Sequence, residues 1–138
     1  MQVEVLMTAS SATVEARLNV QGGGWEYYTP VTMPGTVGGH VAGIATLDAA
    51  ELGRTPTLNI VITDADGHDM GSSASMIISG IRRGTAPGVL VRVPFAVPFT
   101  VAVRRSMVLK VAALHEGAEL AAVTFHVREP VQDTPPRA

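Results

Sequence analysis

Cysteine is absent from this sequence, and lysine and tryptophan occur once each, as Lys110 and Trp25. The lack of cysteine excludes disulfide bridges and zinc sites that need thiolate ligands, but it leaves the redox compartment open. Charge is also scarce, since 16% of the residues are charged and the net charge is −2. Such a chain projects no broad field toward nucleic acid or anionic lipid, so we expect neither as a partner.

Long hydrophobic runs are missing as well. The longest apolar stretch, Val89–Val103, is interrupted by Arg92, Pro94 and Pro98, which excludes a membrane-spanning helix. The first basic residue is Arg17, so the start of the chain lacks the charged segment of a secretory signal. These two absences predict a soluble, cytoplasmic protein.

The chain is instead rich in residues that favour strands. Val, Thr and Ile supply 38 of the 138 residues, and their branched side chains suit a pleated sheet. Fourteen glycines and nine prolines supply material for turns. The length fits one domain, which we place at residues 1–128. Residues 129–138 contain several prolines and few apolar side chains, so we expect them to form a disordered tail.

Alternation of apolar and polar residues predicts strands in the first half of the chain. In the first of them Val3, Val5 and Met7 are expected to point inward, with Leu6 out of phase. Another has apolar residues in both phases, so we expect both of its faces to be covered. In order, the predicted strands are Gln2–Thr8, Thr13–Gln21, Gly39–Leu47 (the one covered on both faces) and Thr57–Asp64.

The most regular alternation is in Val89–Val103, where every odd position is valine or phenylalanine. Pro94 and Pro98 fall in the other phase of this ribbon. Because proline cannot donate to a ladder of hydrogen bonds, the ribbon is expected at the edge of a sheet or crossing between two sheets with a bend.

The remaining elements are a hairpin and a short helix. Met107–Leu114 and Glu119–Val127 flank a turn in which Gly117 can adopt a positive φ. Asp48 and Glu51 have the spacing of a capping box, and Gly53 can end the short helix that they begin. With about seven or eight strands, the sequence predicts an all-β fold, a two-sheet antiparallel β-sandwich of immunoglobulin-like or similar form.

Asp64, Asp66 and Asp69 stand around Gly67 as in the opening of a calcium-binding EF-hand loop. The glutamate that such a loop needs at its twelfth position is replaced here by Ser75, and the flanking segments read as strands. We therefore interpret the segment as a β-turn, with weak calcium binding as the alternative hypothesis.

Gly22–Tyr28 contains three of the six aromatic residues of the chain. One interpretation makes Trp25 and the two tyrosines a platform on which a ligand stacks. The other makes Trp25 a plug over one end of the core, beside a glycine turn, and we favour it because a lone tryptophan in a small domain usually belongs to the core.

Other chemically capable residues form no motif. No two histidines have the spacing of metal ligands, and His115, next to a turn, is expected to be solvated. The serines lack the Gly-x-Ser-x-Gly pattern of a nucleophile elbow and are expected in a loop, and the paired arginines are expected in solvated turns. These residues are His40, His68, His115 and His126, Ser72, Ser73, Ser75 and Ser79, and Arg82-Arg83 and Arg104-Arg105. The sequence therefore predicts no catalytic, cofactor-binding or metal-binding residue and no cofactor, and we do not expect an enzyme.

Several of these segments together resemble a bacterial family of uncharacterised small all-β domains. The resemblance covers most of residues 1–128, and its motifs are structural. It rests on Leu18-Asn19-Val20, Gly22–Trp25, Leu58–Gly67 and Phe125-His126-Val127. It implies a β-sandwich and supplies no activity, cofactor or catalytic residue, and the proline-rich ribbon at Val93–Phe99 departs from it.

These observations predict a non-enzymatic interaction or structural module that acts through its surface. We expect a protein partner or a homo-oligomer, with an edge ribbon such as Val89–Val103 pairing with another strand, although its prolines and Arg92 oppose such pairing. The alternative is a domain that binds a small ligand at Trp25–Tyr28 or calcium at Asp64–Asp69.

Overall fold

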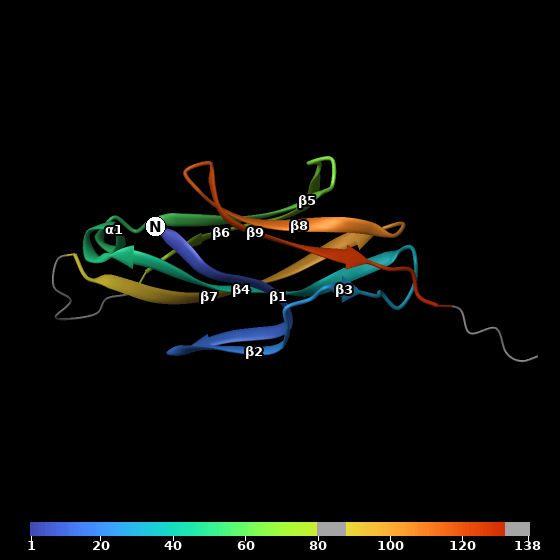
Figure 1. The fold of residues 1–138 in the computed structure, drawn as a ribbon, viewed down its shortest axis with the longest axis horizontal. Coiled ribbons are helices and arrows are strands. Elements are labelled where there is room, and N and C mark those ends of the chain that lie inside the picture. The colour runs from blue at the N-terminus through green and yellow to red at the C-terminus, as the bar shows by residue number, and fades with distance from the viewer. Residues whose placement is uncertain (80–87, 132–138) are drawn as a thin grey trace, which may run out of the picture.

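The computed structural model describes residues 1–79 and 88–131, which form nine strands and one short helix (Figure 1). In chain order the elements are β1 (Gln2–Glu15), β2 (Arg17–Gly23), β3 (Tyr27–Tyr28), β4 (Gly35–Asp48), α1 (Ala49–Gly53), β5 (Thr57–Asp64), β6 (Asp69–Ile77), β7 (Leu90–Val103), β8 (Met107–His115) and β9 (Ala118–Val127).

Two sheets pack face to face, which confirms the predicted β-sandwich (Figure 1). One sheet has the order β2-β1-β4-β7 and the other the order β3-β9-β8-β5-β6. All pairs are antiparallel except that of the two-residue strand β3, which runs parallel to β9. The described residues contain nine strands rather than seven or eight, because β3 is too short to alternate and the serines of β6 were expected in a loop.

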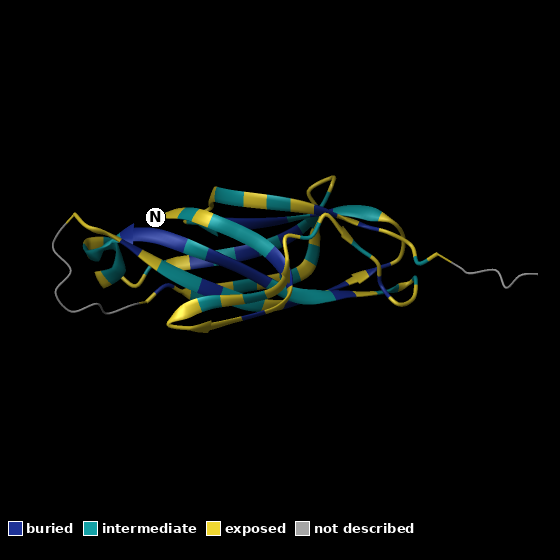
Figure 2. Cartoon of the chain, turned by 60° about the horizontal axis from the view of Figure 1, so that its bottom comes forward, coloured by how far each residue is buried: buried dark blue, intermediate teal, exposed yellow. Residues whose placement is uncertain are grey.

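The core lies between the sheets and is formed by inward residues of β4, β5, β7, β8 and β9, together with Ile78. Figure 2 shows the buried residues as bands along the strands. Alternation in β5 matches the prediction, with Leu58, Ile60 and Ile62 all buried. The largest fully buried side chains are Phe125, Leu47, Leu58, Ile62 and Leu109.

β4 is covered on both faces, as predicted. Val41 and Ala42 point to opposite faces of the sheet, and both are completely buried. Val41 belongs to the core, whereas Ala42 lies on the outer face, over which the hairpin of β1 and β2 folds back in both views. Contacts of β2 with β4 and β7 accompany this cover.

The prediction of one strand over Thr13–Gln21 was wrong, because the chain reverses at Ala16, whose φ is 58°. Val14 pairs with Leu18 and Ala12 with Val20, so even residues face even residues across the turn at Ala16. Apolar alternation therefore continues through the turn with its phase unchanged. A hairpin of this register has the same sequence pattern as one long strand.

The inward residues of β1 also differ from the prediction. Val3 and Leu6 pack against the core, whereas Val5 and Met7 do not. The register with β4 shifts between Val3 and Val5, which marks a β-bulge at Glu4. One extra residue reverses the alternation, and this explains why Leu6 was out of phase.

β7 is an edge strand, one of the two arrangements predicted for it. Of the strands that the structure describes, it pairs with β4 alone, through fourteen consecutive residue pairs from Gly35↔Val103 to Asp48↔Leu90. An unbroken ladder accommodates Pro94 and Pro98 only if their nitrogens face the open side of the sheet.

Two further local predictions are confirmed. Asp48 accepts a hydrogen bond from the Glu51 backbone N–H, and the Glu51 carboxylate accepts one from the Asp48 N–H, which completes the capping box of α1. In the β8–β9 turn, Glu116 and Gly117 both have positive φ, of 51° and 79°.

Within the described residues no helix is long or apolar enough to cross a membrane. Arg82, Arg83 and residues 132–138 lie outside the described residues.

Candidate functional site

Among the described residues, β6 is the last strand of its sheet and pairs with β5 alone. Its nine residues contain no lysine, arginine or proline. Met70, Ala74 and Met76 pack against the core, whereas Ser73 and Ser75 are exposed. The expectation that the serines lie in a loop was therefore wrong for Ser72, Ser73 and Ser75, because small polar residues can occupy the solvent phase of an edge strand.

Backbone groups of β6 face the open side of the sheet at alternate residues. The N–H of Ile78 donates to the Pro56 carbonyl oxygen at 2.8 Å, so even-numbered residues turn their N–H and C=O toward β5. The odd residues Ser73, Ser75 and Ile77 then turn theirs away from β5. The N–H of Gly71 is occupied, since it donates to Oδ1 of Asp69 at 2.7 Å. Within the part of the chain that the structure describes, these three odd residues thus present backbone groups that pair with no other strand.

A groove lies on the outer face of the sheet beside β6. It has a volume of about 280 Å³. Its lining comes from β5, β6 and the β8–β9 hairpin and consists of Asn59, Val61, Asp69, Ser73, Ala74, Ser75, Leu114 and Gly117. Because the serines are small, a side chain that arrives from beyond β6 can extend over them to Asn59 and Val61.

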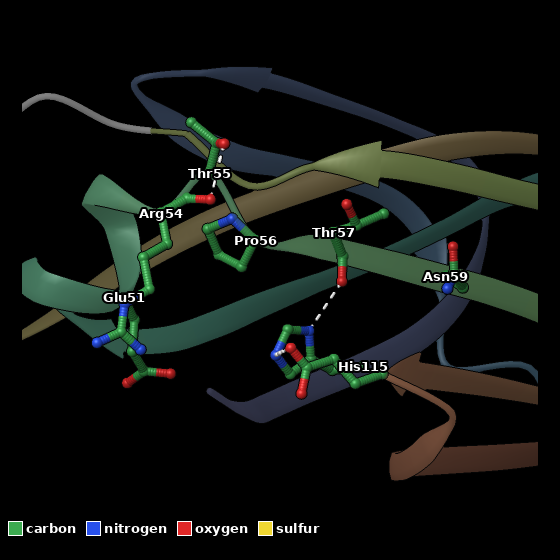
Figure 3. Close-up of a pocket in the computed structure, with 8 residues that line it drawn as sticks. Glu51, Arg54, Thr55, Pro56, Thr57, Asn59 and His115 are labelled. Atoms are coloured by element: carbon green, nitrogen blue, oxygen red, sulfur yellow. Dashed lines mark hydrogen bonds and ion pairs between the residues drawn. The ribbon is translucent and has the colours of Figure 1, made fainter.

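A larger hollow adjoins this groove at Asn59 and reaches α1 (Figure 3). Its volume is about 460 Å³, and its lining is mostly polar and of mixed charge. The residues are Glu51, Arg54, Thr55, Pro56, Thr57, Asn59, His115 and Glu116. Thr55 has a φ of 49°, which is strained for a β-branched residue.

His115 is fixed in this hollow rather than solvated, contrary to expectation. Its side chain is 22% exposed, and Nδ1 lies 2.9 Å from the Thr57 carbonyl oxygen. Since a carbonyl can only accept, Nδ1 carries the proton of this bond, and Nε2 is directed toward Glu116, 3.9 Å away. On the opposite wall Glu51 binds the terminal ammonium of Met1, and this hydrogen bond holds the pKa of Glu51 below its usual value of 4.5.

The acidic segment forms the turn between β5 and β6, as we interpreted it. Oδ1 of Asp64 accepts hydrogen bonds from the backbone N–H groups of Asp66 and His68, both at 2.9 Å. Oδ2 lies 3.1 Å from Nδ1 of His68, and these bonds hold the pKa of Asp64 below its usual 3.8. Asp64, Asp66 and His68 come close enough to share an ion, but Asp69 is engaged with Gly71. The carboxylates serve the turn, and calcium binding there stays a hypothesis.

Trp25 plugs one end of the core, in agreement with the structural interpretation. Its ring lies 4.9 Å from that of Tyr28, 5.4 Å from Phe125 and 5.9 Å from Phe99, between centroids. The indole N–H donates to the Gly22 carbonyl oxygen at 2.8 Å. Tyr27 is more exposed, but the Arg128 guanidinium covers its ring at 3.1 Å from the centroid. The described geometry therefore leaves the aromatic cluster packed rather than open for stacking.

The other chemical residues predicted from sequence remain dispersed. Within residues 1–79 and 88–131, Ser72 and Ser75 form no hydrogen bond with a histidine, since His68 binds Asp64 and His115 binds a carbonyl. His126 is exposed beside Tyr27, with ring centroids 5.5 Å apart. Arg104 and Arg105 lie exposed in the bend between β7 and β8, as expected.

The groove could not be recognised in advance, because its residues come from three distant segments. Asn59 was visible in the polar phase of a predicted strand. Its position beside Ser73 and Gly117 depends on the order β8-β5-β6, which alternation does not encode.

Comparisons with known proteins add little to this geometry. No protein-family model matches the sequence, and no curated protein matches it. Among solved structures, a glycosyl hydrolase family 2 member from Bacteroides cellulosilyticus DSM 14838 is similar, with a TM-score of 0.38 and 11% sequence identity. The match covers 72% of this chain and 14% of that chain. The resemblance to small bacterial all-β domains stays a prediction.

Proposed function

We propose that this β-sandwich is a non-enzymatic interaction module that binds an extended segment of protein along β6. The observation that carries the proposal is the open edge at Ser73, Ser75 and Ile77, whose backbone N–H and C=O groups face away from β5. An incoming strand can pair with these groups and extend the five-stranded sheet by one strand.

The other long edge strand supports this choice by contrast. β7 carries Pro94, Pro98 and the charged Arg92, all of which oppose pairing with a new strand. β6 carries none of these residue types and has its single charge, Asp69, at one end. Of these two edges, β6 is the one suited to recognition.

The groove supports the same function by offering specificity. Side chains of a paired segment alternate between the two faces of the sheet, so every second one lies above Ser73 and Ser75. A long side chain there can reach Asn59, whose amide both donates and accepts hydrogen bonds. Main-chain pairing then supplies affinity, and the groove selects the side chain.

Replacement of one residue tests the proposal. Ser75→Pro removes an outward N–H that β5 does not use, and Ser75→Thr keeps that N–H and serves as the matched control. We expect the intact chain and the threonine variant to capture the same proteins from the native host, and the proline variant to lose them. Addition of a captured protein should slow hydrogen exchange at Ser73, Ser75 and Ile77.

Both variants must first show the circular dichroism spectrum of the parent chain. Capture of the same proteins by Ser75→Pro, with unchanged exchange at the three β6 amides, would refute pairing at this edge.

A further inference from the structure

We propose that a second copy of this chain supplies the strand that pairs with β6, antiparallel about a two-fold axis at Ser75. This inference rests on the proposed role of the β6 edge. It makes a single ten-stranded sheet from the two five-stranded sheets of the partners.

The positions of the outward backbone groups determine the register. Ser73, Ser75 and Ile77 offer both N–H and C=O, whereas the N–H of Gly71 is held by Asp69. Only an axis at Ser75 uses all three residues on both copies. Ser75 then faces Ser75 of the second copy, and Ser73 faces Ile77.

Charge favours the antiparallel arrangement. Asp69 is the single charged residue of β6 and lies six residues from the axis at Ser75. Asp69 lies opposite Thr63 and Ser75 opposite Asn59, four strand positions apart, because the register shifts between them. At about 3.4 Å per residue, each Asp69 is roughly 14 Å from the axis, and the two carboxylates are on opposite sides of it. This separation far exceeds the Debye length of about 8 Å in physiological salt, so the two charges do not repel across the interface.

Side chains along the edge also permit close approach. Ser73 and Ser75 are small and exposed, so neither obstructs the incoming backbone. Ile77 is 64% exposed and would lie opposite the small Ser73 of the second copy, which removes apolar surface from water. On the inner face Ala74 lies opposite Met76, and both already pack against the core.

The absence of cysteine from the chain allows a direct test with single cysteines. Residues that face each other in a hydrogen-bonded antiparallel pair have Cα atoms about 5.5 Å apart, within the range that a disulfide spans. Oxidised Ser75→Cys should therefore run as a covalent dimer on a non-reducing gel. Ser73→Cys is the matched control, because its two copies are offset by four residues, or roughly 14 Å along the strand, and should not cross-link.

Light scattering of the full chain supplies an independent measurement. We expect a mass of twice 14.4 kDa for the parent and for Ser75→Thr. Ser75→Pro removes one hydrogen bond from each copy at the axis and should raise the dissociation constant at least about tenfold. If the proline variant does not fold, Ser75→Lys replaces it as the test. This variant places two ammonium groups at the axis and should be a monomer.

The outcomes separate this inference from the proposed function. If the parent chain is a monomer and captures a host protein through Ser75, the proposed dimer is refuted, whereas the proposed interaction module is supported. A dimer that cross-links equally through Ser73→Cys, or that survives both Ser75→Pro and Ser75→Lys, overturns this register. A monomer whose β6 amides stay unprotected in the presence of host proteins overturns both.

Discussion

β6 and β7 lie against each other at the same side of the sandwich, one in each sheet, and they present opposite kinds of edge. β7 carries two prolines and an arginine that forms an ion pair with Glu4 at 2.9 Å. β6 is uncharged from Met70 to Ile77 and contains no proline. Among the described residues, one edge thus carries the side chains that oppose strand addition and its neighbour lacks them, and the proposed function rests on this contrast.

The two strands also differ in how firmly the core holds them. Phe95 and Phe99 of β7 are 4% and 6% exposed, whereas Met70, Ala74 and Met76 of β6 are only partly buried. A large aromatic side chain contributes more to stability than a half-buried thioether. The blocked edge is therefore part of the core, and the open edge is a lightly attached strand.

Truncation of one side chain in each strand should give the largest effect. Phe95→Ala is expected to lower the free energy of unfolding by about 3–5 kcal/mol, because it leaves a cavity in the core. Met76→Ala should cost roughly 1–2 kcal/mol, because part of that side chain is already in water. Urea denaturation followed by circular dichroism measures both, and equal losses would contradict the difference in attachment.

Removal of the prolines from β7 should make the two edges alike. We expect Pro94→Val with Pro98→Val to add association that depends on concentration, while the free energy of unfolding changes by less than about 1 kcal/mol. Light scattering over a range of protein concentration measures this. Pro130→Val, outside the strands, is the control, and the blocking role of the prolines fails if the double variant associates no more than this control.

Acid should have the smallest effect, and it should act at the turn between β5 and β6 rather than at β7. Hydrogen bonds, first of all from the His68 backbone N–H, hold the pKa of Asp64 below 3.8. This interaction therefore stabilises the turn fully above pH 3.8 and is lost as the pH falls through the lower pKa of the folded chain.

The amide chemical shifts of Asp66 and His68 should then move in acid before those of β7 do. Asp64→Asn keeps an acceptor without the titration and should flatten the curve at these two amides. Simultaneous movement of β7 amides would show global unfolding rather than loosening of the β5–β6 turn.

The sequence predicted those parts of the fold that depend on neighbouring residues. Alternation in Thr57–Asp64 gave a strand with the bounds of β5, and the capping box at Asp48 gave the helix. Features that depend on whether odd or even positions point inward were missed. The turn at Ala16 preserves the phase of alternation and is invisible to it, whereas the bulge at Glu4 reverses the phase within a strand.

The candidate site was harder to predict than the fold. Edge position is a property of strand order, and nothing in Met70–Ile77 distinguishes an edge from a polar loop. The prolines of β7 allowed its edge position to be predicted, because proline is incompatible with a central strand. An open edge strand such as β6 cannot be recognised in this way, because it lacks prolines of the kind that identify β7 as an edge strand.

Two glycines of β4 have a consequence for how this sequence can vary among relatives. A Cβ atom at Gly39 would overlap the Trp25 ring and the Ala9 carbonyl oxygen, and one at Gly43 would overlap the Phe95 ring and the Val5 carbonyl oxygen. A smaller side chain in place of either ring removes only one of the two overlaps. Relatives that keep β1 beside β4 should therefore exchange the aromatic residues more readily than the glycines, and an alignment of them would show glycine at both positions where the rings have changed.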